Sequence, residues 1–212
     1  MLKPLIYFFC LVQATLFAAP LTSSAQEVAE PKFIFETGDP PWRGERLVLP
    51  PGFAPDLGWN GIEHIRFAPG MFDFNKPDFF SYVIAFLLSA EADTSEAVLE
   101  KELLTYYRGL SEAVMGGKGQ TVDTGTFTIS LEKDETLKSF PPEVEGGNAY
   151  SGVLKWIEPF ATQKAQTLNL EIFVWKHGDQ PVVLSCVSPA ARDEEVLWEE
   201  LRGISEKFRL EP

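Results

Sequence analysis

The fold is decided by one segment, residues 79–104, with the sequence "FFSYVIAFLLSAEADTSEAVLEKELL". From Phe79 to Ser89 both sets of alternating positions are apolar. A half-exposed strand would alternate apolar and polar residues, so this pattern is typical of a central strand that is covered on both faces. The sequence therefore predicts a long strand in the middle of a sheet, with other elements packed above and below it.

A long helix is predicted to follow, from about Thr94 to Met115. Its apolar stripe recurs at the 3.6-residue period and consists of Leu99, Leu103, Tyr106, Leu110 and Val114. Asp93 stands three residues before Glu96, the spacing of a capping box, in which each side chain satisfies a free amide of the first turn. The glycines at 116–117 are expected to end the helix, because glycine adopts the left-handed conformation easily.

Shorter strands and a second helix complete the predicted domain. Alternation at period two marks half-buried antiparallel strands at about 62–67, 126–132, 150–157, 167–175 and 181–188. Residues 46–50, "RLVLP", are a candidate edge strand, and a last helix is expected at about 193–208. Residues 132–148 are polar and contain prolines, which predicts a loop. The predicted class is α+β: an antiparallel sheet of about six strands with two main helices packed on it, similar to an α/β/α sandwich.

This order of elements resembles the PsbP/Mog1/DcrB group of small α/β/α domains. The resemblance lies in "RLVLPPGF" (46–53), in the strand and helix of residues 79–104, and in "PVVLSCVSPAARDEEVLWEELRGISEKFRL" (181–210). It covers much of the chain as element order and residue character, without a diagnostic motif. It implies a fold and no particular reaction, since one fold serves many functions.

The first 25 residues have the layout of a cleaved export signal: one cation, Lys3, an apolar run from Leu5 to Ala19, and small residues up to Ala25. The run is shorter than the roughly 20 residues that a membrane-spanning helix needs. We therefore predict cleavage after Ala25 and a secreted or periplasmic protein without membrane insertion. The predicted organisation is a signal peptide (1–25), a proline-rich extended segment (26–58) and a single α+β domain (59–212).

Charge and cysteine content restrict the partners. Removal of Lys3 with the signal leaves 17 basic and 31 acidic side chains, a formal charge of −14. Nucleic acid is therefore excluded as an expected partner, because phosphate binding needs a basic surface. Cys186 becomes the lone cysteine, so an internal disulfide is impossible. Its alternation with Val182 and Leu184 favours a buried small hydrophobe, and exposure would permit an intermolecular disulfide.

A cluster of apolar residues in a loop is the candidate ligand site. Phe67, Met71, Phe72 and Phe74 lie around Pro69 and Gly70, where the chain is predicted to turn. Apolar side chains in a loop need a reason, because loops run over the surface. These four either close over the end of the sheet or line a pocket.

No catalytic, metal or phosphate-binding motif is found, and no cofactor is predicted. His64 and His177 are the only histidines and belong to no spaced motif. His64 is adjacent to Glu63, but neighbouring strand residues point to opposite faces. We favour a non-catalytic exported domain that binds a partner protein or a small ligand. The alternatives are a secreted hydrolase that uses His64 with a carboxylate from elsewhere in the fold, and a structural or assembly factor of the cell envelope.

Overall fold

The structure is a computed structural model that describes residues 31–212, which form one compact unit. Its strands are β1 (Lys32–Ile34), β2 (Arg43–Leu49), β3 (Gly61–Phe67), β4 (Tyr82–Leu88), β5 (Thr128–Lys133), β6 (Asn148–Ile157), β7 (Ala165–His177), β8 (Gln180–Ser188) and β9 (Arg209–Glu211). Its helices are α1 (Glu96–Gly117) and α2 (Glu195–Glu206), with a short 3-10 turn at Thr124–Thr126. The predicted signal segment and its cleavage after Ala25 lie outside the described residues.

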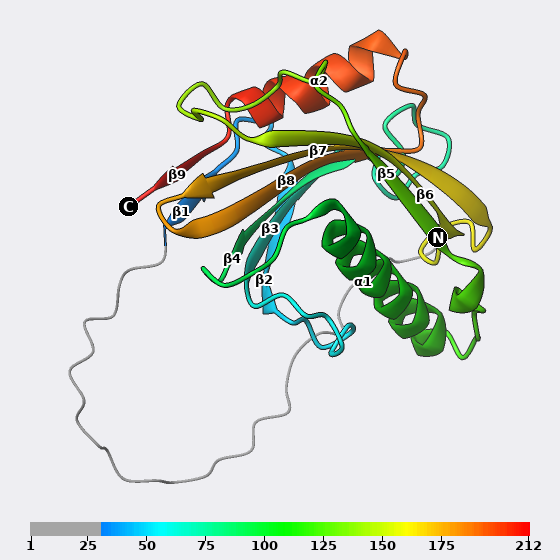
Figure 1. The fold of residues 1–212 in the computed structure, drawn as a ribbon. Coiled ribbons are helices and arrows are strands. Elements are labelled where there is room, and N and C mark those ends of the chain that lie inside the picture. The colour runs from blue at the N-terminus through cyan, green and yellow to red at the C-terminus, as the bar shows by residue number, and fades with distance from the viewer. Residues whose placement is uncertain (1–30) are drawn as a thin grey trace, which may run out of the picture. The chain divides into compact units, whose positions relative to one another are not determined.

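Seven strands form one sheet in the order β2-β3-β4-β8-β7-β6-β5, and every neighbouring pair is antiparallel. Helix α1 lies on one face of the sheet and α2 on the other (Figure 1). The α+β class with two helices packed on an antiparallel sheet is confirmed. The sheet has one strand more than the six expected, because the candidate edge strand at 46–50 is real and forms the end of β2.

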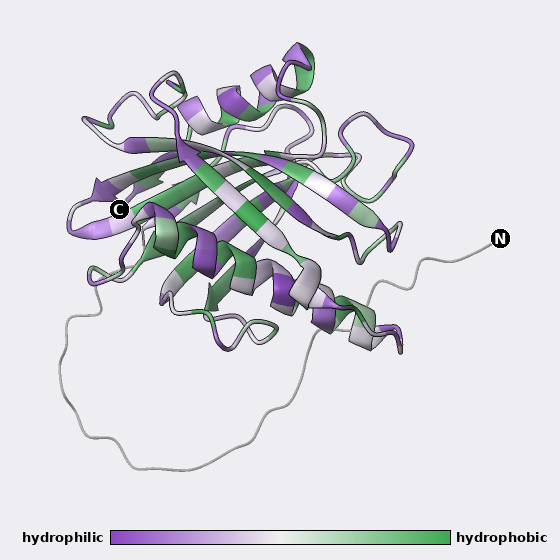
Figure 2. Cartoon of the chain, turned by 45° about the vertical axis from the view of Figure 1, so that its right-hand side comes forward, coloured by the Kyte–Doolittle hydropathy of each residue, from purple (hydrophilic) through white to green (hydrophobic). Residues whose placement is uncertain are grey.

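Strand β4 is central, as the apolar run predicts. It lies between β3 and β8, and all seven of its residues are buried. Tyr82, Ile84, Phe86 and Leu88 belong to the core on the α1 side, and Val83, Ala85 and Leu87 belong to the core on the α2 side. Figure 2 shows the hydrophobic residues gathered on the central strands. The two faces of this one strand thus supply both cores.

Two local predictions at the ends of α1 are wrong. Asp93 accepts a hydrogen bond from the amide of Ser95 at 2.8 Å, and the cap residue Ser95 makes no side-chain cap bond. A carboxylate held in this tight turn cannot form the predicted capping box. At the other end, residues 116–117 are still helical, and Gly119, with φ of 70°, supplies the left-handed conformation two residues later.

Two further boundaries differ from the predicted ones, because contacts between distant residues determine them. β4 begins at Tyr82 instead of Phe79, because Phe80 has φ of 51° and its amide donates to the carbonyl of Met71 at 3.1 Å. The predicted last helix ends at Glu206, and the following residues form β9, which pairs with β1. The β1–β9 ladder joins the two ends of the described chain into a separate two-stranded sheet.

The polar loop between β5 and β6 is fastened to α2. The hydroxyl of Ser205 donates to the carbonyl of Ser139 at 2.6 Å, and the hydroxyl of Ser139 donates to Glu206 at 2.9 Å. Phe140 packs edge to face on Phe173, with ring centroids 5.0 Å apart. This loop therefore covers part of the α2-side core.

Cys186 is buried in the α2-side core, where its thiol donates to the carbonyl of Leu201 at 3.3 Å. Burial raises the pKa of the Cys186 thiol well above its ordinary value. Since the thiolate is the reactive form, we expect the native protein without residues 1–25, in which Cys186 is the lone cysteine, to resist Ellman's reagent and to react with one equivalent in guanidinium chloride. Rapid stoichiometric reaction of the native protein would contradict this burial.

Candidate functional site

The candidate functional site is an apolar pocket on the α1 side of the sheet, near the end where β3 passes into the loop 68–81. Its volume is about 100 Å³. We call it the aromatic pocket. Its walls come from β2, β3, β4, α1 and three loops, and they consist of Glu45, Leu47, Phe53, Glu63, Ile65, Phe67, Met71, Phe72, Phe80, Tyr82, Ile84, Tyr106, Leu110 and Phe160.

The loop 68–81 forms one wall and is closed on itself. The amide of Gly70 donates to a carboxylate oxygen of Asp78 at 2.6 Å. A Cβ on residue 70 would lie 2.1 Å from the other oxygen of Asp78, so this closure requires glycine. Phe80, the last residue but one of the loop, has a left-handed φ of 51°, which costs a non-glycine residue about 1 to 3 kcal/mol. Strain of this kind is typical of ligand clamps.

The four loop residues predicted from the sequence divide into two groups. Phe67, Met71 and Phe72 line the pocket, and Phe74 does not. Met71 is buried, whereas Phe72 is 58% exposed and Phe74 is 64% exposed. Phe72 therefore stands at the mouth of the pocket, and Phe74 points to solvent from the same loop.

Phe72 is part of an aromatic arch across the mouth. Its ring centroid lies 6.0 Å from that of Phe67 and 5.8 Å from that of Phe160. Phe160 is held by the turn after β6, in which the buried carboxylate of Glu158 accepts from the amides of residues 160, 161 and 162 at 2.5 to 3.1 Å. The arch thus joins two loops that are far apart in the sequence.

Glu63 is the buried carboxyl group of the pocket. It is 1% exposed, and its Oε1 accepts a hydrogen bond from the hydroxyl of Tyr106 at 2.9 Å. Among residues 31–212, its Oε2 and the hydroxyl of Ser185 are the buried side-chain oxygens without a hydrogen-bond partner. Leaving such an atom unpaired costs about 1 to 3 kcal/mol, and more for a charged group. Ser185 lines a different cavity of about 10 Å³, room for about one water molecule.

The environment of Glu63 disfavours its charge. Burial raises the pKa of Glu63 to about 7, the hydrogen bond from Tyr106 opposes this rise, and the negative charge of Glu45 adds to it. The pKa of Tyr106 is also well above its ordinary value, through burial and through the adjacent Glu63. Near neutral pH the pocket therefore contains a carboxyl group that can exist in either form.

Glu63 and His64 point to opposite faces of β3, as expected from their adjacency. His64 stacks on Phe33 with ring centroids 4.2 Å apart and an angle of 11° between the planes. It borders an open hollow of about 500 Å³ beside β2, in which the Thr37 hydroxyl accepts a hydrogen bond from the amide of Trp42. The ring packs as an aromatic surface, and the structure does not bring it together with Glu63.

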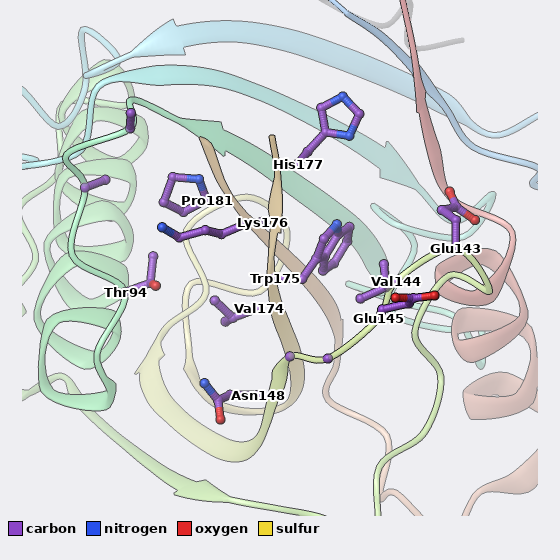
Figure 3. Close-up of a pocket in the computed structure, with 14 residues that line it drawn as sticks. Thr94, Glu143, Val144, Glu145, Asn148, Val174, Trp175, Lys176, His177 and Pro181 are labelled. Carbon is purple, nitrogen blue, oxygen red and sulfur yellow. The ribbon is translucent and has the colours of Figure 1, made fainter. Parts of the chain in front are cut away.

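The second histidine borders a wide groove of about 470 Å³ on another part of the molecule. Figure 3 shows its lining side chains, which come from the connection after β4, from the loop before β6 and from the β7–β8 hairpin. His177 and Lys176 are exposed at the hairpin, as are Glu143 and Glu145 across the groove. Because water already solvates these exposed charges, they do not require a ligand as a hydrogen-bond partner. The unpaired oxygen of Glu63 is buried and has no such solvation.

Residues 31–212 contain neither a candidate metal-binding cluster nor a candidate membrane-spanning helix. Within this range, no three histidine, cysteine, aspartate or glutamate side chains gather where they could hold a metal ion. No helix in the same range combines the length and the apolar character needed to cross a bilayer.

Comparisons with known proteins assign no family. No protein-family model and no curated protein matches the chain, so the resemblance to the PsbP/Mog1/DcrB group remains a prediction. Among solved structures, the chain is similar to LpqN, described as involved in cell envelope biogenesis of Mycobacterium tuberculosis. The two are 16% identical, the alignment covers 89% of this chain and 88% of LpqN, and the TM-score is 0.36. The site therefore has to be interpreted from the residues of this chain alone.

Glu63, the polar centre of the pocket, was not among the residues predicted for ligand binding. Its signal was present in the sequence, because Glu63 alternates with Ile65 and Phe67 on the face of β3 that is directed to the core. A carboxylate at such a position is rarely buried without a partner. Tyr106 belonged to the predicted apolar stripe of the helix, but Phe53 and Phe160 carried no local signal, because they meet the pocket only through packing of distant segments.

Proposed function

We propose that this protein is an exported, non-catalytic binding domain that holds a small apolar ligand in the aromatic pocket. The observation that carries the proposal is the pocket itself: a cavity walled by aromatic rings with a half-exposed ring, Phe72, at its mouth. Ligand sites are typically apolar concavities with a few convergent polar groups. Export rests on the sequence of residues 1–25.

The size of the pocket limits the ligand. Drug-sized ligands occupy roughly 300 to 1,000 Å³, and an engineered cavity of about 150 Å³ accepts benzene. A pocket of about 100 Å³ therefore takes a group of about four carbon atoms, either a small molecule or one arm of a larger one. Burying four such carbons yields about 3 kcal/mol, which corresponds to a dissociation constant of roughly 10 mM for the isolated group.

We expect 1-butanol to bind in the aromatic pocket with millimolar affinity, and Phe72→Ala to weaken this binding about threefold to tenfold. The substitution removes one ring of the arch, and the melting temperature should change little because the ring is already half exposed. The measurement is a ¹H–¹⁵N NMR titration, with shifts expected at Ile65, Phe67 and Tyr106.

Phe74→Ala is the matched control, because it removes the same side chain from the same loop outside the pocket. It should leave both butanol binding and the melting temperature unchanged. Equal losses of affinity in the two variants would contradict a site under Phe72, and a large loss of stability in Phe72→Ala would mean that this ring is part of the core.

A further inference from the structure

We propose that the ligand of the aromatic pocket is a small organic ammonium ion whose N–H group donates to Oε2 of Glu63. This inference rests on the proposed function, and it adds a charged end group to the small apolar chain that is proposed to occupy the pocket. The first step is the unpaired oxygen. Oε1 of Glu63 is occupied by Tyr106, and Oε2 has no partner among the described residues. Because Glu63 lines the pocket, a ligand there would lie beside a buried acceptor that lacks a donor.

The second step is the charge of the walls. The titratable groups that face Glu63 are Tyr106 and Tyr107 from α1, Tyr82 from β4 and Glu45 from β2. Of the residues that line the pocket in the described chain, none is a lysine, an arginine or a histidine. A cationic ligand would therefore be attracted to the carboxylates of Glu45 and Glu63, whereas an anionic ligand would be repelled by them.

The third step is the aromatic lining. Cations, including the ammonium groups of ligands, are attracted to the faces of aromatic rings, and aromatic cages recognise quaternary ammonium groups in this way. Phe67 and Phe72 stand at the mouth, and Phe53 packs edge to face on Tyr106 with centroids 5.1 Å apart. The alkyl chain and the charge of a short alkylammonium ion would interact with the rings. Its N–H groups would donate to Glu63.

The chemistry predicts a dependence on pH. The carboxylate form of Glu63 binds the cation, and the pKa of about 7 means that roughly nine tenths of it is ionised near pH 8 and roughly one tenth near pH 6. Ammonium binding should therefore weaken about ninefold between these two pH values. A neutral ligand of the same length has no charge to lose and should show a much smaller change.

The experiment uses three probes that share a four-carbon length and differ in charge: n-butylammonium, 1-butanol and butyrate. In NMR titrations of the purified protein near pH 8, we expect n-butylammonium to bind at least tenfold more tightly than 1-butanol, and butyrate to bind most weakly. Glu63→Gln should reduce the affinity for n-butylammonium to that for 1-butanol and should abolish its pH dependence. Glu45→Gln, which changes a second carboxylate at the rim, should have a smaller effect.

The outcomes separate the two proposals. If 1-butanol or butyrate binds as tightly as n-butylammonium near pH 8, or if Glu63→Gln leaves ammonium binding unchanged, the ammonium assignment is wrong and the pocket remains a binding site. If none of the three probes shifts the resonances of the pocket, both the assignment and the proposed function are wrong.

Discussion

Replacing Glu63 with glutamine is expected to raise the melting temperature by roughly 6 to 12 °C near pH 8 and to leave it nearly unchanged near pH 4.5. In the folded protein the pKa of Glu63 is about 7, compared with an ordinary value of 4.5. Between these two values the folded state binds the proton and the unfolded chain releases it, so the free energy of unfolding falls as the pH rises. The accumulated loss is about 3 kcal/mol once the pH has passed 7.

Glutamine imitates the protonated carboxyl group at every pH, so it avoids this loss. It keeps an oxygen that can accept from the hydroxyl of Tyr106 and removes the buried charge. The measurement is a pair of thermal unfolding curves for each protein, with the difference between variant and parent taken at each pH. Glu199→Gln, at an exposed position on α2, is the control and should give no difference at either pH. An equal change at both pH values would show that burial of Glu63 does not control its ionisation.

The helices and strands show how far the sequence predicts the fold of this molecule. Alternation and helical period are local signals, and they predict β4, α1 and the β7–β8 hairpin correctly because each is stabilised by burying its own apolar face. The pairing of β1 with β9 has no such signal. It joins three residues at each end, among them Phe33 and Leu210, across most of the chain. Only tertiary packing decides it.

The candidate site, too, is predicted by local sequence signals only in part, and tertiary packing decides the rest. An apolar loop around Phe72 is visible in the sequence, but the sequence does not distinguish Phe72 from Phe74. The distinction comes from the closure of Gly70 on Asp78 and from the distant Phe160, which meets Phe72. The unpaired oxygen of Glu63 depends on which groups pack around it, so no local pattern predicts it.

Arg202→Met is expected to have the other large effect, a loss of about 3 to 5 kcal/mol in the free energy of unfolding. Glu171 is fully buried on the α2-side face of β7, and both of its oxygens accept from the guanidinium of Arg202, at 2.9 and 2.5 Å. The guanidinium also lies 5.6 Å from the ring of Trp198. Methionine retains the apolar stem and leaves the Glu171 carboxylate buried without its counter-charge.

The expected loss of stability arises because the Glu171 carboxylate is left desolvated without a counter-charge, and not only because its attraction to Arg202 is lost. A second substitution, at Glu171, tests this cause. In the double variant Arg202→Met with Glu171→Gln, the buried charge is gone as well, and we expect most of the lost stability to return. Urea unfolding curves of the parent, both single variants and the double variant give the coupling energy. Arg209→Met is the matched control: its partners Glu36 and Glu211 lie 2.7 and 3.1 Å away, but all three side chains are about half exposed, so the free energy of unfolding should hardly change. If Arg202→Met and Arg209→Met were equally mild, the ion pair would not be what fastens α2 to the sheet.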